Sequence, residues 1–144
     1  MSEAMGTGAK ASWLFWLVVA IAILWNGFGG YDYTMSHVSG DAYFRQSGMT
    51  EAKIAEYHAY PSWLHAVWAI GVWGSVAGSI LLLLRSRWAF HAFALSSLGA
   101  AGALIHTIVG GAAPGELVLP LVVVVICAFF VWFSLTMTKR GVLR

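Results

Sequence analysis

The sequence predicts an all-α fold, a four-helix transmembrane bundle, and three observations support this fold class. The 144 residues are 60% hydrophobic and only 10% charged, with a mean hydropathy of +0.77, whereas soluble domains carry roughly 25% charged residues. The apolar residues form four separate stretches without Asp, Glu, Lys or Arg. The charges also divide into a basic and an acidic group. A soluble fold this short cannot bury so much apolar surface.

The four stretches have the length that a membrane-spanning helix requires, which is about 20 mostly apolar residues. They cover 13–31, 63–84, 88–109 and 117–136, and their ends are aromatic or lie beside charges, as helix anchors at a membrane interface do. We therefore expect residues 1–144 to form a single integral membrane domain. A loop at 32–62 then connects the first two spans.

The distribution of basic residues predicts the orientation of the bundle. One side carries six of the eight basic residues, namely Lys10, Arg85, Arg87, Lys139, Arg140 and Arg144. The other side carries five of the six acidic residues, namely Asp32, Asp41, Glu51, Glu56 and Glu116. Because basic residues concentrate on the cytoplasmic side of membrane proteins, we expect both termini in the cytoplasm (N-in and C-in). The loop 32–62 then faces the outer side of the membrane.

The outer loop contains the signals of one short helix. Thr50 is a favourable N-cap, and Glu51 follows it in the first turn, where the helix dipole favours a negative charge. Pro61 ends the helix, because the residue before a proline avoids the helical conformation. We expect a helix that runs to about Ala59 and lies as a cap over the bundle.

Small residues predict where the helices pack most closely, since membrane helices associate through close approach and polar contacts. The second span offers Gly71, Gly74 and Gly78, and the third offers Gly99 and Gly102. We expect these faces to pack against each other within one chain. The alternative is that they form a contact between copies of the chain in a homo-oligomer.

Polar side chains near the outer end of the first span are candidates for a binding site, because polar groups inside a membrane are costly. The set consists of Trp25, Asn26, Asp32 and Tyr33. Asn26 lies within the apolar stretch and must find a partner on a neighbouring helix, so we expect an interhelical hydrogen bond. In the alternative interpretation, the four residues form the outer binding face for a neutral or sugar-like solute.

Histidines and carboxylates on the outer side form a second candidate set. His65 and His106 should lie at similar depth, and His58, Glu116 and Asp32 belong to the same side of the membrane. Such a group can bind a transition metal, relay protons or ligate a haem. No pair has the spacing of a helix-borne metal motif, so we expect ordinary hydrogen bonds at these histidines and no cofactor.

The sequence contains no nucleophile motif, phosphate-binding loop or dinucleotide fingerprint, and its single cysteine, Cys127, lies within an apolar stretch. It therefore predicts a non-enzymatic protein. Its partners are the lipid bilayer and either another membrane protein or further copies of itself, and nucleic acid is excluded.

Several segments of the chain match a known family, namely 24–36, 61–63, 68–74, 81–89, 93–96 and 132–133. The most specific of them joins Trp25-Asn26 to Asp32-Tyr33. On these segments the chain resembles a family of small four-helix inner-membrane proteins of proteobacteria that are sometimes labelled sugar transporters. The resemblance implies the same four-span topology in a bacterial inner membrane, and the sugar label implies a solute that stacks on aromatic residues near Asn26 and Asp32.

The sequence leads to three hypotheses for function. The first is a non-enzymatic accessory, assembly or self-associating scaffold protein, which fits the small size and the many close-packing surfaces. The second is a small oligomeric transporter of a neutral or sugar-like solute, because four helices are too few for an ordinary carrier. The third is a membrane protein that binds a metal or haem through histidines.

Overall fold

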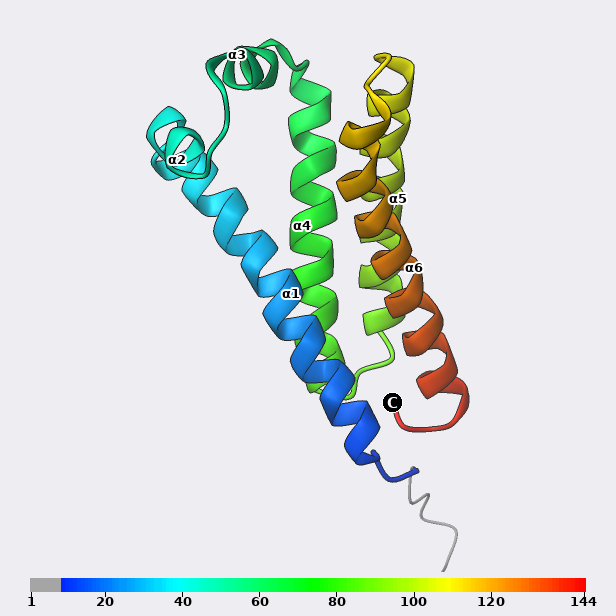
Figure 1. Ribbon diagram of the computed structural model, residues 1–144. Coiled ribbons are helices and arrows are strands. Elements are labelled where there is room, and N and C mark those ends of the chain that lie inside the picture. The colour runs from blue at the N-terminus through cyan, green and yellow to red at the C-terminus, as the bar shows by residue number, and fades with distance from the viewer. Residues whose placement is uncertain (1–8) are drawn as a thin grey trace, which may run out of the picture.

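Four long helices dominate the computed structural model, which describes residues 9–144. They are α1 (Trp13–Val38), α4 (Ser62–Leu83), α5 (Ala89–Val109) and α6 (Val118–Lys139), with a short 3-10 helix, η1 (Pro114–Leu117), directly before α6 (Figure 1). Their apolar segments have mean hydropathies of 1.7, 1.9, 1.7 and 2.8, so each is long and apolar enough to cross a membrane. Residues 9–144 contain no strand. The predicted all-α bundle is confirmed.

Helix α1 is longer than the predicted span 13–31. It continues to Val38 because residues 31–38 contain no Gly or Pro that would interrupt it. Ser39 caps its C-terminal end, and the following residue, Gly40, has a φ of +53°, which glycine adopts readily. The 26 residues of α1 extend over about 39 Å. The last turns therefore reach beyond the apolar stretch on which the prediction depended.

Two short helices cross one end of the bundle, which we call the capped end (Figure 1). Helix α3 (Glu51–Ala59) is the predicted cap, and the Thr50 hydroxyl accepts a hydrogen bond from the Lys53 amide at 3.3 Å. Helix α2 (Asp41–Gln46) was not predicted. Its six residues form one short turn with no apolar periodicity, so no pattern in the sequence distinguishes it from a loop.

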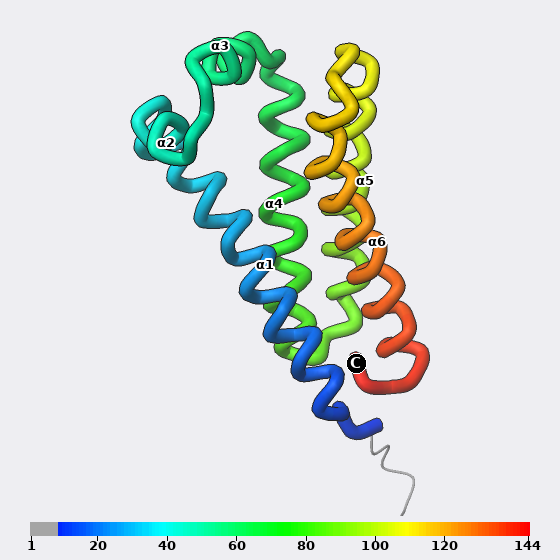
Figure 2. Tube along the Cα trace, in the orientation of Figure 1, coloured from blue at the N-terminus to red at the C-terminus, as the bar shows by residue number. Residues whose placement is uncertain are grey.

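The long helices are arranged in the order α1, α4, α5, α6, with the most extensive contact between α4 and α5. Helices α1 and α6 meet at the end opposite the cap, where the rings of Phe15 and Phe133 stack at 5.9 Å. Toward the capped end, α1 leans away from α6 (Figure 1). The described N-terminal segment and the C-terminus lie together at the end opposite the cap, here called the tail end (Figure 2).

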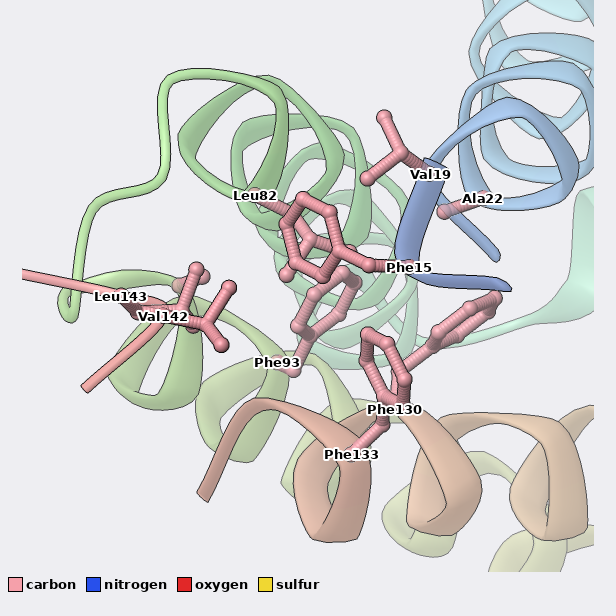
Figure 3. Close-up of a cluster of buried hydrophobic side chains, with 10 residues drawn as sticks. Phe15, Val19, Ala22, Leu82, Phe93, Phe130, Phe133, Val142 and Leu143 are labelled. Carbon is pink, nitrogen blue, oxygen red and sulfur yellow. The ribbon is translucent and has the colours of Figure 1, made fainter. Parts of the chain in front are cut away.

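The buried core lies at the tail end, where apolar side chains from all four long helices converge (Figure 3). The rings of Phe93 and Phe130 stack at 5.1 Å, and Leu82 beside them is fully buried. Val142 and Leu143 fold back from the end of α6 and belong to the same cluster. The basic C-terminal segment is therefore part of the packed structure and not only a charged tail.

Arg85 connects the chain termini to the turn between α4 and α5. Its Nε donates to the Val142 carbonyl at 3.0 Å, and its Nη2 donates to the Ala9 carbonyl at 2.8 Å. The Arg144 amide also donates to the Arg85 carbonyl at 2.8 Å. Arg85 has a φ of +55°, which is uncommon for a residue with a side chain. These contacts close the tail end of the bundle.

Glycines allow the close approach of α4 and α5. A Cβ atom added at Gly99 would lie 2.9 Å from the Gly71 nitrogen and from the Val67 carbonyl oxygen. At the same contact, the Ser96 hydroxyl donates to the Gly71 carbonyl at 2.6 Å. Four of the five glycines singled out in the sequence therefore lie within the chain's own α4–α5 contact, namely Gly71, Gly74, Gly78 and Gly99. The fifth, Gly102, lies at its margin, where an added Cβ would meet Val67 alone, at 3.4 Å.

Candidate binding site at the capped end

A cavity of about 290 Å³ lies beneath α2 and α3 at the capped end. We call it the capped cavity. Half of its lining residues are aromatic, namely Tyr43, Phe44, Tyr57, Tyr60, His65, Trp68 and His106. Asp32 of α1 also lines it. This cavity therefore combines aromatic rings with one carboxylate.

The rings of the capped cavity are held by contacts among the short and long helices. Phe44 of α2 meets Tyr57 of α3 at 4.7 Å between ring centroids, and Tyr57 meets His65 of α4 at 4.9 Å. Ile54 of α3 is buried, whereas Glu51 on the same helix is exposed. The amphipathic character of α3 thus fixes which side of the cap faces the cavity.

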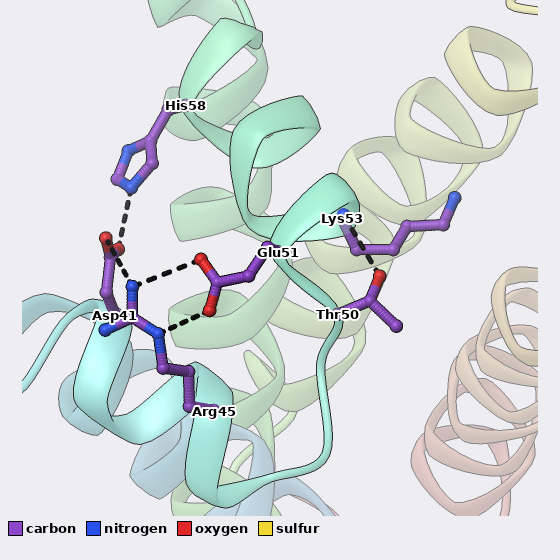
Figure 4. Close-up of polar contacts among 6 residues, drawn as sticks. All are labelled: Asp41, Arg45, Thr50, Glu51, Lys53 and His58. Carbon is purple, nitrogen blue, oxygen red and sulfur yellow. Dashed lines mark hydrogen bonds and ion pairs between the residues drawn. The ribbon is translucent and has the colours of Figure 1, made fainter.

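Ion pairs hold α2 and α3 together on the outside of the cap (Figure 4). The Arg45 guanidinium donates to Glu51 at 2.6 Å and holds the pKa of that carboxyl below its ordinary value of 4.5. His58 Nε2 lies 2.7 Å from Asp41 Oδ1. These exposed pairs orient the two short helices more than they stabilise the fold.

A further ion pair connects the cap to the segment before α6. The Lys53 ammonium donates to the Glu116 carboxylate, and this contact holds the pKa of Glu116 below its ordinary value. Glu116 also accepts a hydrogen bond from the Ala113 amide at 3.0 Å, at the start of η1. The cap is thereby tied to two different parts of the bundle, through α2 and through η1.

A second cavity, of about 390 Å³, opens between α1 and α6 below the capped cavity. We call it the side groove. Its floor consists of small residues of α4 and α5, namely Gly71, Ser75, Ser96, Gly99, Ala100 and Ala103. Its walls include Trp25 and Phe28 from α1 and Leu119 and Val123 from α6. The groove exists because α1 and α6 meet only near the tail end, and its lining is predominantly apolar.

The two cavities adjoin, because Asp32, Trp68 and Ala103 line both of them. The Tyr43 hydroxyl donates to Asp32 Oδ1 at 2.7 Å, and this hydrogen bond raises the pKa of Tyr43 above its ordinary value of 10.0. Tyr43 therefore stays protonated at neutral pH and holds the Asp32 carboxylate in place. No Lys, Arg or Glu lines either cavity in the described part of the chain, and Asp32 is the only Asp that does.

Three of the four residues predicted for a solute site lie at these cavities, namely Trp25, Asn26 and Asp32. Tyr33 lines neither cavity within residues 9–144. It stacks on His37 at 4.2 Å and contacts Trp68 at 4.8 Å, so it supports a lining residue from outside.

Asn26 connects α1 to α4 deep in the bundle, where its side chain is only 5% exposed. Its Nδ2 donates to the Ser79 hydroxyl at 2.8 Å. The Ser79 oxygen lies 2.8 Å from the Ser75 carbonyl oxygen and 3.2 Å from that of Ala22. The hydrogen bond expected for Asn26 between helices is therefore present at the edge of the side groove.

The histidines and carboxylates of the metal hypothesis lie in three different places. His65 and His106 both line the capped cavity, where Tyr60 lies between them at 6.3 Å and 5.7 Å from their rings. His58 pairs with Asp41, and Glu116 pairs with Lys53. Among residues 9–144, no three His, Cys, Asp or Glu side chains gather as a metal site requires.

Sequence reasoning did not select the aromatic lining residues Tyr43, Tyr57, Tyr60 and Trp68. One signal was present, since all five tyrosines lie between residues 31 and 60. That clustering is also typical of the aromatic belt at a membrane interface, so it did not distinguish a cavity wall from a lipid anchor.

Comparisons with protein-family models, curated proteins and solved structures give no match.

Proposed function

We propose that the protein lies in a bacterial inner membrane with its tail end in the cytoplasm and its capped end outside. The six basic residues used for this assignment cluster by sequence at the tail-end turn and in the two terminal segments. Contacts of Arg85 with Ala9 and Val142 support the placement of these three segments on one side. Because basic residues are retained in the cytoplasm, this orientation follows.

Cysteine labelling tests the orientation. In a Cys127→Ser background, we expect Ser47→Cys to react with a membrane-impermeant maleimide in intact spheroplasts. We expect Ser86→Cys, in the turn between α4 and α5, to react only after the membrane is opened. Labelling of both cysteines from the same side would contradict the proposed topology.

We further propose that the protein is non-enzymatic and binds a small amphiphilic molecule from the outer leaflet. The observation that carries this proposal is the adjoining pair of cavities, one lined by aromatic rings and a carboxylate beneath the cap and one apolar between α1 and α6. Ligand sites in proteins are typically mostly apolar clefts of about 300–1,000 Å³ with a few polar groups. A ligand with its polar group at Asp32 and its apolar part in the side groove matches this arrangement.

The geometry favours one-sided binding over a transport path. At the tail end, the rings of Phe15, Phe93, Phe130 and Phe133 fill the space between the helices. The cavities therefore open toward the capped side and laterally between α1 and α6. A protein that binds a lipid-like molecule on one side is suited to an accessory role beside a larger membrane complex. The small residues Gly71 and Gly99 already form the contact between α4 and α5 within one chain. They therefore do not favour a contact between copies of the chain.

Native mass spectrometry of the protein, extracted gently from its own membrane, tests this function. We expect a bound small mass in the wild-type protein and its loss in Val123→Trp, where the indole occupies the side groove. The matched control is Val125→Trp, which makes the same change two residues further along α6 at a side chain that is 61% exposed. This control should retain the bound mass.

Other results of the same experiment would contradict the proposal. A stoichiometric protein partner or a fixed homo-oligomer without any small mass would favour the scaffold hypothesis. A small mass that persists in Val123→Trp and disappears in Val125→Trp would place the ligand on the outer lipid-facing surface and not in the groove.

A further inference from the structure

We propose that the amphiphile is an organic cation, with an ammonium group at Asp32 and an apolar chain in the side groove. This inference rests on the proposed binding function and adds the chemical class of the ligand. Its basis is charge complementarity between a cation and the carboxylate of Asp32. This residue lines both cavities and so lies where they adjoin.

The charge of the site selects a cation. Asp32 contributes a carboxylate. The described lining residues include no Lys or Arg that would neutralise this negative charge, and no second acidic side chain. Tyr43 donates to Asp32 Oδ1. No hydrogen bond to Oδ2 occurs within residues 9–144, so this oxygen can face a ligand. An anionic headgroup would instead be repelled by a partly buried negative charge.

The aromatic wall selects the same ligand class. Tyr57 and Trp68, whose ring centroids are 6.0 Å apart, line the capped cavity together with Tyr60 and Tyr43. Aromatic faces attract cations through their quadrupole, and quaternary ammonium groups in particular are bound in cages of such rings. A carboxylate beside several rings therefore favours an alkylammonium group over a strongly hydrated metal cation.

The side groove provides space for the apolar part of the ligand. Trp25 and Asp32 are seven residues apart on α1, which corresponds to about 10 Å along the helix axis. Trp25 and Phe28 precede Asp32 on α1, on its tail-end side, and line the groove opposite Val123 of α6. A single amphiphile can therefore place its headgroup beneath the cap and its chain among these side chains.

The test compares three probes with the same decyl chain, namely decyltrimethylammonium, decyl glucoside and decyl sulfate, on the full-length protein in maltoside micelles. Saturable binding is measured by native mass spectrometry. We expect decyltrimethylammonium to bind at least about tenfold more tightly than the other two probes, because only its headgroup gains the ionic and cation–π contacts. Asp32→Asn, which preserves the shape and the Tyr43 contact, should abolish this preference.

Asp41→Asn is the matched control. It removes the same charge from the capped end, but Asp41 pairs with His58 and lines neither cavity in the described residues. The preference for the cation should persist in this variant. The comparison of the three headgroups uses the unmodified protein, so it remains decisive even if Asp32→Asn fails to fold.

The outcomes separate this inference from the proposed function. Equal binding of all three probes would overturn the cation assignment and leave amphiphile binding intact. A cation preference that survives Asp32→Asn would have the same two consequences. Equal weakening of all three probes by Asp32→Asn would show a general distortion of the site and would also overturn it. Saturable binding of none of the probes would contradict both the inference and the proposed function.

Discussion

Gly99→Ala is expected to destabilise the bundle by about 2 kcal/mol, within the range for overpacking a tightly packed contact. The new methyl group would lie 2.9 Å from the Gly71 nitrogen and the Val67 carbonyl oxygen, and 3.0 Å from the Gly71 Cα. These are backbone atoms of α4 and cannot rotate away. Helices α4 and α5 must therefore separate, and the hydrogen bond from Ser96 to Gly71 lengthens with them.

The measurement is the midpoint of unfolding in mixed micelles with an increasing fraction of dodecyl sulfate, followed by circular dichroism. Gly102→Ala is the matched control, one turn further along α5, where the methyl group would meet only the Val67 side chain at 3.4 Å. Its unfolding free energy should change by less than about 1 kcal/mol, since alanine also favours the helix. Equal stability of the two variants would show that α4 and α5 are not in close contact at Gly99.

Phe93→Ala is expected to reduce the unfolding free energy by about 3 kcal/mol, at the lower end of the range for truncating a buried phenylalanine. The lower end applies because lipid tails are themselves apolar, which leaves the loss of packing as the main cost. Phe93 is 0% exposed and stacks on Phe130. Gly78 leaves the space for the ring, since a Cβ there would lie 2.8 Å from it.

The same unfolding assay with Phe129→Ala provides the comparison. Phe129 lies on α6 beside Phe130, but its side chain is 42% exposed. The loss of its contacts with Phe130 and Phe133 should cost less than half as much as the loss of Phe93. An equal effect of the two substitutions would contradict the placement of the core at Phe93.

Hydropathy was sufficient to predict the four spans, because an apolar stretch of this length is stable only as a membrane helix. The cap was partly predictable, since Thr50 and Pro61 bound α3 with local signals. The extension of α1 from residue 31 to Val38 was not predicted. Hydropathy shows where the apolar residues end. The helix itself ends at Val38, shortly before Gly40, where the backbone adopts a positive φ.

The site was less predictable than the fold because cavities depend on helix arrangement. The sequence identified Asn26 and Asp32 as polar residues near the end of an apolar span. It carried no information on the divergence of α1 from α6, which creates the side groove. Periodicity indicates that a helix has a packing face but does not identify its neighbour. Trp68 illustrates the difference, since it is one of several tryptophans in the sequence and yet lines both cavities.

Photo-crosslinking tests the central claim, that an amphiphile occupies the side groove, most directly. The probes are decyltrimethylammonium and decyl glucoside analogues with a diazirine at the chain end, and the labelled residues are mapped by peptide mass spectrometry. We predict that label concentrates at Val72 and Cys127, deep in the groove, and that excess unlabelled probe displaces it. Label spread over lipid-facing side chains such as Leu98 (72% exposed) and Val125, without displacement, would contradict the account.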